Sequence, residues 1–201
     1  MKLIPIIVCF VLGLGLTACR HPKEKGSPVL VNNKSAAVNT RKKVQDYPYA
    51  ITYGSPTAPH QLVSFFDMGC DHCADFYRDH FLTIQKKWID TGKLCLTFKP
   101  YPVHGETLVF MACCEVLTAI ERQLLFETLM EVKVFSAEVI QKCMRVLKKP
   151  FQMPTAAVLK EALVITKIHK FEALPVMFFD GEPLNDTQQD TIMNFLEETL
   201  T

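Results

Sequence analysis

The sequence lacks an excess of charge of either sign, because 22 lysines and arginines stand against 21 aspartates and glutamates, for a net charge of +1. Proteins that bind nucleic acid usually carry a strongly basic surface, so the composition argues against a nucleic-acid partner. A second Cys-x-x-Cys or a His-x₃-His is also missing, which weighs against a tetrahedral zinc site. The sequence also lacks a long hydrophobic run, because the apolar stretch at 3–16 is shorter than the roughly 20 residues of a transmembrane helix.

The composition does support a folded core. Apolar residues make up 49% of the 201 residues, which suits one domain or one domain with an insertion. Eight cysteines are many for a cytosolic protein but few for a small disulfide scaffold.

The beginning of the chain has the plan of a signal peptide, with Lys2 before the apolar stretch at 3–16. The following Leu16-Thr17-Ala18-Cys19 resembles the bacterial lipobox, in which cleavage precedes the cysteine and that cysteine receives lipid. We therefore expect a lipoprotein signal peptide over 1–18, lipid on Cys19 and a flexible, polar tether over 19–46. The mature protein would be exported and anchored to a membrane, facing the periplasm or the cell exterior. An ordinary secretory signal, or a membrane anchor with an incidental cysteine, is the alternative.

The chemistry of the chain is concentrated around Cys70 and Cys73, which follow a strand-like run at 61–66. A helix-like pattern comes next, because apolar residues recur at four-three-four spacing, namely Tyr77, Phe81, Ile84 and Trp88. Cys73 continues that apolar face, whereas Cys70 falls at the helix start, where free N–H groups and the helix dipole favour a negative charge. This predicts an accessible, thiolate-prone Cys70 and a buried, resolving Cys73, the machinery of thiol–disulfide exchange.

The folded domain is expected to begin near Tyr47 with an α/β unit. A second strand-like run at 93–98 follows the predicted helix, and Gly92 is placed to end that helix. A strand–helix–strand unit with a reactive pair at the strand-to-helix turn favours two parallel strands.

The middle of the chain, from 104 to 170, is helix-like throughout. The pattern predicts a buried helix over 108–120, a second over 121–134, a third capped by Ser136 and a fourth over about 155–170 after two prolines. The final segment returns to strand and turn. It has a strand-like run at 176–179, an Asp-Gly turn at 180–181, a short returning strand, and a last helix capped by Asn185 or Asp186.

These features together resemble DsbA-like thiol–disulfide oxidoreductases, a thioredoxin fold interrupted by a helical domain. The resemblance rests on four segments: Phe65-Phe66-Asp67, Cys70-Asp71-His72-Cys73, Lys99-Pro100-Tyr101-Pro102-Val103-His104 and Ala173-Leu174-Pro175-Val176. It implies an α/β fold whose first part spans 47–102 and whose second part spans 172–201, with an all-helical insertion at 103–171.

The resemblance also implies roles for individual residues. Cys70 would be the nucleophile, Cys73 the resolving cysteine and His72 a stabiliser of the thiolate. Leu174 and a cis-proline at Pro175 would bind substrate beside the redox-active disulfide. The expected enzyme is a protein thiol:disulfide oxidoreductase without a cofactor or metal. As a monomer, it would act on exported cysteine-containing proteins and exchange electrons with a membrane redox partner.

Two departures from the family pattern bear on the direction of exchange. Asp71 places an acid beside the nucleophile and opposes a very low thiolate pKa. Related proteins often carry a buried acid six residues before the first cysteine, and this position is Ser64. Oxidase activity, meaning disulfide formation, remains the first expectation, with reductase or isomerase activity as the alternative.

The other reactive side chains receive simpler interpretations. One of Cys113 and Cys114 can pair with Cys143, or all three can remain buried free thiols, and Cys95 is expected in the core. Lys99 is expected to be solvated, with a place near the active site as the alternative, and His60 and His104 are not expected to be catalytic. Two other functions stay open. One is a metal site at the cysteine pair, and the other is a lipoprotein chaperone that holds clients near Pro175.

Overall fold

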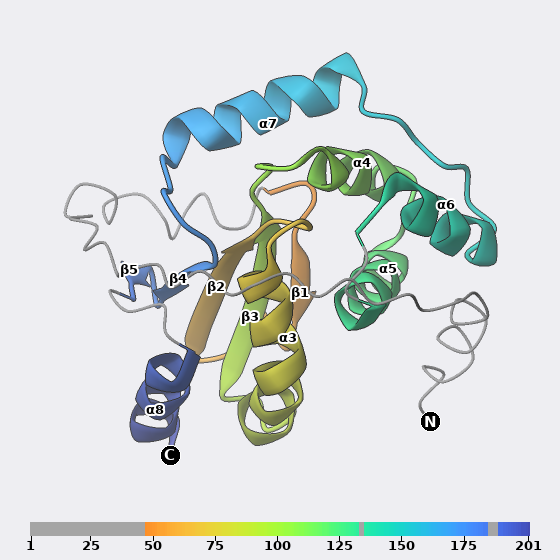
Figure 1. Cartoon of the computed structure of the whole chain (residues 1–201). Coiled ribbons are helices and arrows are strands. Elements are labelled where there is room, and N and C mark those ends of the chain that lie inside the picture. Colours follow the sequence, from red (N-terminus) through yellow and green to blue (C-terminus); the bar gives the residue numbers. More distant parts are fainter. Residues whose placement is uncertain (1–46, 133–134, 185–188) are drawn as a thin grey trace, which may run out of the picture.

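The computed structural model describes residues 47–132, 135–184 and 189–201 (Figure 1). The expected signal peptide, Cys19, the tether, and the two candidate caps of the last helix, Asn185 and Asp186, lie outside the described residues. No helix within these described ranges is long and apolar enough to cross a membrane.

A mixed five-stranded sheet forms the centre of the molecule, in the order β1-β3-β2-β4-β5. Its strands are β1 (Ile51–Tyr53), β2 (His60–Phe66), β3 (Leu94–Pro100), β4 (Val176–Phe179) and β5 (Glu182–Pro183). The pair β2 and β3 is parallel, as the strand–helix–strand pattern predicts. The other pairs are antiparallel, and β4 turns into β5 through Asp180 and Gly181, which both have positive φ. This fits the turn signal of the sequence.

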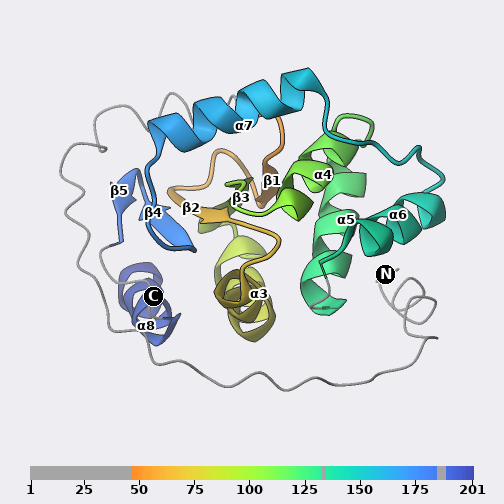
Figure 2. The same ribbon diagram turned by 45° about the horizontal axis from the view of Figure 1, so that its top comes forward.

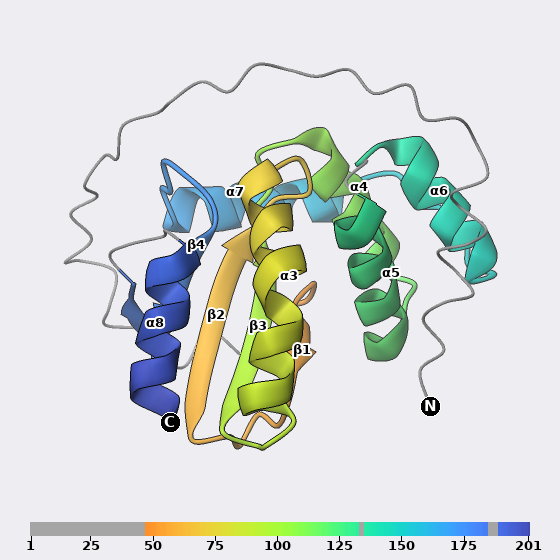
Figure 3. The same ribbon diagram turned by 60° about the horizontal axis from the view of Figure 1, so that its bottom comes forward.

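Two helices cover one face of the sheet (Figure 3). These are α3 (Asp71–Ile84), which continues into a π-helical turn (Gln85–Ile89), and α8 (Gln189–Leu200). The apolar face predicted for α3 is buried, with Tyr77, Phe81, Ile84 and Trp88 all at most 6% exposed. Because strand side chains alternate between faces, even-numbered residues of β3 meet this helix: Phe98 contacts the rings of Tyr77 and Phe81. Gly92, at φ +75°, follows the π-helical turn.

The insertion is helical, as predicted, and contains α4 (Gly105–Cys114), α5 (Ala119–Val132), α6 (Ala137–Val146) and α7 (Ala156–Ile168). Ser136 caps α6 and Thr155 caps α7 through side-chain oxygens that accept N–H groups. The prediction of a single helix over 108–120 is wrong. The chain leaves the helix after Cys114, and Thr118 and Glu121 form a reciprocal cap that starts α5.

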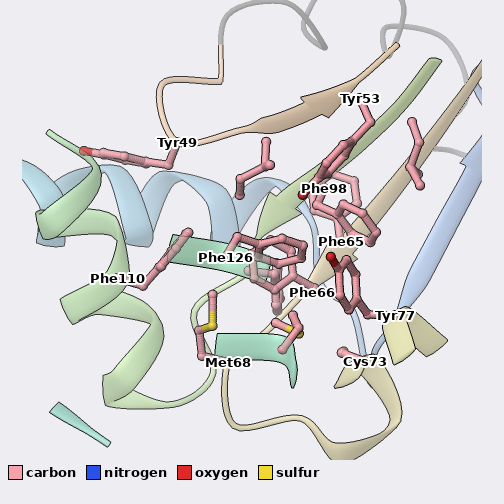
Figure 4. Close-up of a cluster of buried hydrophobic side chains, with 14 of the residues drawn as sticks. Tyr49, Tyr53, Phe65, Phe66, Met68, Cys73, Tyr77, Phe98, Phe110 and Phe126 are labelled. Carbon is pink, nitrogen blue, oxygen red and sulfur yellow. The ribbon is translucent and has the colours of Figure 1, made fainter. Parts of the chain in front are cut away.

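The helices of the insertion divide between two places (Figures 1 and 2). Helices α4, α5 and α6 pack together at the β1 side of the sheet. There, Phe66 of β2 meets Phe110 of α4 and Phe126 of α5 in a shared aromatic core (Figure 4). Helix α7 instead lies across the face of the sheet opposite α3. Odd-numbered residues of β3 face this side, and among them Lys99 is 3% exposed. The expectation that Lys99 is solvated is therefore wrong, because the fold covers the face from which it projects.

Candidate active site

Cys70 is the N-cap residue of α3, directly before the first helical residue. Its backbone is extended, and its sulfur accepts the N–H of Cys73 at 3.2 Å, as cap side chains do. The Cys70 thiol is partly exposed and also lies 3.6 Å from the carbonyl oxygen of Leu174, to which it donates. The structure thus presents the dithiol form, with the first sulfur held at the helix N-terminus.

Cys73 lies one turn into α3 and is buried, at 4% exposed. The Cys73 thiol is a hydrogen-bond partner of Cys70, and this bond is the largest cause that lowers the pKa of Cys70 below its usual value. The N–H groups of Cys73 and His72 lower it further, while burial and the charge of Asp67 raise it. For Cys73, burial, followed by the bond to Cys70, raises the pKa far above the usual value. The two sulfurs are therefore unlike, because the surroundings of Cys70 favour its thiolate and those of Cys73 favour its protonated thiol.

The Leu174–Pro175 peptide lies beside the cysteine pair and is cis, as the resemblance implies. The position of this loop follows from the sheet, since Val176 pairs with Phe65 directly after the proline. Both the loop and the cysteine pair are thus attached to the end of β2, one through strand pairing and one through the chain itself.

A buried carboxylate, Asp67, organises the loop between β2 and α3. Its side chain accepts five hydrogen bonds. The donors are the N–H of Gly69 at 2.8 Å, the N–H groups of Val103 and His104 at 2.8 and 2.9 Å, the Thr107 hydroxyl at 2.7 Å and Nδ1 of His104 at 2.5 Å. The Thr107 oxygen in turn accepts the N–H of Met68 at 2.7 Å. Asp67 therefore joins the cysteine loop to the first turn of the insertion.

His104, which the sequence did not predict to be catalytic, lies beside the cysteine loop. Its side chain is 52% exposed, and its ring covers Gly69, where an added Cβ would come within 2.6 Å of the ring. The bond to Asp67 is the main cause that raises the pKa of His104, and interaction with the Cys70 thiolate adds to it. The His104 ring therefore lies near the reactive sulfur, in surroundings that favour its protonated form. Because His104 and Asp67 are 37 residues apart in the sequence, no local pattern indicated that they are in contact.

The remaining predicted residues occupy the first turn of α3 or its surroundings. Asp71 and His72 are both exposed. The backbone N–H of His72 helps to lower the pKa of Cys70. Ser64 is buried and pairs with Met177, so the position six before Cys70 lacks an acid. The buried acid of this site is Asp67, three residues before Cys70.

All six cysteines of the described ranges are free thiols. Cys95, Cys113, Cys114 and Cys143 are buried, and burial raises the pKa of each. Of the two interpretations of the insertion cysteines, the structure therefore supports buried free thiols rather than a disulfide to Cys143. Within the same described ranges, no group of three or more histidines, cysteines or carboxylates is arranged to hold a metal ion.

Comparison with known proteins places this geometry in a family. A family model described as Thioredoxin matches residues 46–198. The catalytic domain of ScsC from Proteus mirabilis is 18% identical, with a TM-score of 0.64 over 82% of this chain and 97% of that chain. Oxidised BdbD from Bacillus subtilis is also 18% identical, with a TM-score of 0.61 over 76% and 93% of the two chains.

DsbA from Chlamydia trachomatis is likewise 18% identical, with a TM-score of 0.55 over 87% of this chain and 96% of that chain. A search of curated protein sequences finds no match. At these identities the structural likenesses establish a shared fold, and the family model covers most of the chain. The chain therefore belongs to the thioredoxin family and has the fold of the DsbA-type thiol–disulfide oxidoreductases.

Proposed function

We propose that this protein is an exported thiol:disulfide oxidoreductase that forms disulfides in exported proteins through the pair Cys70 and Cys73. The observation that carries the proposal is the contrast between the two sulfurs. Cys70 is partly exposed with a lowered pKa, and Cys73 is buried with a raised pKa. Exchange needs one sulfur that a partner can reach and one that resolves internally.

The reaction balances without a cofactor. A substrate thiolate attacks Sγ of Cys70 in the Cys70–Cys73 disulfide, forms a mixed disulfide and expels Cys73, which takes up a proton. A second substrate thiolate attacks the substrate sulfur of the mixed disulfide and expels Cys70 as a thiolate. Two electrons have then moved from the substrate dithiol to the protein. A membrane redox partner returns the protein to the disulfide form by the reverse exchange.

The direction of exchange depends on the stability of the reduced form. Hydrogen bonds from the Cys73 thiol and from two backbone N–H groups favour the Cys70 thiolate. Stabilising the thiolate stabilises the dithiol and makes the disulfide a stronger oxidant. This supports an oxidase over a reductase. Leu174 and Pro175 complete the site as the surface that receives the substrate main chain next to Cys70.

Trapping experiments test the exchange. Cys73→Ser, which lacks the resolving sulfur, should accumulate a mixed disulfide when its Cys70 thiolate attacks a disulfide of a scrambled, disulfide-bonded model protein and expels one substrate thiolate, and mass spectrometry would detect the product. Cys70→Ser should form none. Cys143→Ala is the matched control, because Cys143 is a buried cysteine of the insertion, and it should behave as the wild type. Equal trapping by Cys70→Ser and Cys73→Ser would contradict the proposed roles.

Equilibration with glutathione tests the direction separately. An oxidase should have a reduction potential above about −180 mV, whereas thioredoxin-type reductases lie near −270 mV. A potential near the lower value, with trapping intact, would keep the exchange chemistry but reverse its direction.

The location of the protein is a further part of this proposal. Export and anchoring are supported by the signal-like stretch and by Leu16-Thr17-Ala18-Cys19. Cys19→Ser should release the protein from membranes or stall its processing, as measured by fractionation and intact mass. An unchanged mass and membrane fraction would contradict lipid attachment at Cys19.

A further inference from the structure

The sheet face opposite α3 lines a half-open cavity of about 890 Å³ between the strands and α7. Its floor comes from alternate residues of neighbouring strands, such as Val63 and Phe65 of β2 and Cys95 of β3, and its roof includes Val164 and Ile165 of α7. The volume lies in the range of small-molecule sites, roughly 300–1,000 Å³. The cavity is thus large enough for a ligand and separate from the Cys70 site.

Lys99 gives this cavity a distinctive chemistry. The residue is 3% exposed and lines the cavity. Within the described ranges its ammonium has cation–π contacts, 5.2 Å from the centroid of the Tyr47 ring and 5.7 Å from that of Phe65, but no hydrogen bond or ion pair. A buried charge normally has an ionic partner, and cation–π contacts replace only part of that stabilisation. The Lys99 ammonium therefore borders the cavity without an anionic partner among the described residues, and an anion bound in the cavity would stabilise it.

The acidic groups of the cavity do not supply such a partner. Asp180, at the opposite end, is engaged by Nδ1 of His60 and by the N–H of Gln61, each at 2.8 Å. Glu161 of α7 acts through its charge on Tyr47 and forms no salt bridge with Lys99 in the part of the chain that the structure describes. Burial lowers the pKa of Lys99 to about 8. The side chain is then mostly protonated at neutral pH and can form an ion pair with a bound anion.

The shape of the cavity points to the rest of the ligand. Its lining extends from Thr52 on β1 through β3 and β2 to Phe178 on β4, which is three strand spacings or about 14 Å. Apolar side chains from both layers line this length, and Val164 and Ile168 on α7 are 41% and 52% exposed. An elongated apolar body with one acidic end matches both the shape and the charge.

We propose that the cavity between α7 and the sheet binds a single-chain amphiphilic carboxylate, with its acid group on the Lys99 ammonium and its alkyl chain along Phe65, Phe178 and Ile165. The chemistry is that of a fatty acid. The proposal is independent of thiol exchange, because no cysteine of the redox pair lines the cavity.

Calorimetric titration of the full chain with dodecanoate, below its micelle concentration, tests this site. We expect saturable binding of one molecule. Lys99→Met should weaken binding about 10- to 100-fold, the loss expected for one charge-assisted hydrogen bond. Lys167→Met, an exposed lysine of the same roof helix, is the matched control and should not change affinity. Dodecan-1-ol should bind wild type and Lys99→Met with equal, weak affinity.

A second pair of variants keeps the test decisive if Lys99→Met folds poorly. Val164→Asp places a negative charge at the cavity wall on an exposed position and should weaken dodecanoate binding more than about tenfold by like-charge repulsion. Leu163→Asp is its control, because Leu163 is 58% exposed on the same helix but does not line the cavity. Absence of saturable binding would overturn the proposal. Equal affinity in Val164→Asp and Leu163→Asp would overturn it as well.

Discussion

Replacement of Asp67 by Asn tests the structural centre of the active-site loop. One carboxylate oxygen accepts three donors, from Val103, His104 and Thr107, and the other accepts the N–H of Gly69 and Nδ1 of His104. If the amide oxygen of Asn takes the first position, its NH₂ group faces the Gly69 N–H and leaves that donor without an acceptor. The variant also loses the charge that strengthens the remaining bonds.

These losses set the expected decrease in the free energy of unfolding. One unsatisfied, partly buried donor costs about 1–3 kcal/mol, and the weakening of the remaining charge-assisted bonds adds on the order of 1 kcal/mol. We therefore expect Asp67→Asn to lower the free energy of unfolding by about 2–4 kcal/mol. Asp90→Asn, an exposed carboxylate beyond the far end of α3, should change it by less than about 0.5 kcal/mol.

The same substitution should alter the redox chemistry. The charge of Asp67 raises the pKa of both Cys70 and Cys73, so its removal should lower the pKa of Cys70. Loss of the carboxylate that favours the protonated form of His104 opposes this, and we expect a net decrease in the Cys70 pKa of less than about one unit. Since 1.4 kcal/mol is about 30 mV for two electrons, the reduction potential should rise by less than about 30 mV.

The assay combines urea denaturation of the oxidised and reduced forms with thiolate absorbance against pH. The reduced form of Asp67→Asn should lose less stability than the oxidised form, because only the reduced form gains from the more stable thiolate. Loss of less than about 1 kcal/mol in both forms, together with an unchanged Cys70 pKa, would refute the role given to Asp67.

Three further predictions concern the surroundings of Cys70. Gly69→Ala should destabilise the protein by about 1–3 kcal/mol in urea denaturation, because its Cβ would meet the His104 ring; a similar loss in a His104→Ala background would contradict this cause. The pKa of His104 is raised above 6.5 by Asp67, so its stabilisation is complete below pH 6.5 and is lost as the pH rises through the raised pKa. The stability advantage of wild type over His104→Asn should therefore shrink from pH 6 towards pH 9, and an advantage that grows would reverse the assignment. Asp71→Asn should lower the Cys70 pKa by under about one unit in thiolate titration; a rise would show that Asp71 does not repel the thiolate.

Local patterns predicted much of the fold. The apolar face of α3, the caps at Ser136 and Thr155, and the Asp180–Gly181 turn all depend on residues within a few positions of each other. The parallel pairing of β2 with β3 followed from the strand–helix–strand order. Strand β1 was not predicted, because three residues at the sheet edge carry too short a pattern to recognise.

The residues of the site likewise differ in whether local sequence or tertiary structure reveals them. Cys70, Cys73 and Pro175 are visible in sequence because their spacing and order resemble a known family. The bond from His104 to Asp67 and the burial of Lys99 depend on tertiary structure. An isolated polar residue in the sequence does not reveal whether a distant helix covers it, and α7, which covers the face of Lys99, begins 57 residues later.

The most direct measurement of the central claim is the pH dependence of alkylation of the reduced protein, with peptide mapping of each cysteine. Cys70 should react first, with a midpoint below the usual thiol pKa of about 9, and Cys73 should react only when the protein unfolds. Preferential alkylation of Cys73 in the folded protein, or a Cys70 midpoint at or above 9, would contradict the account.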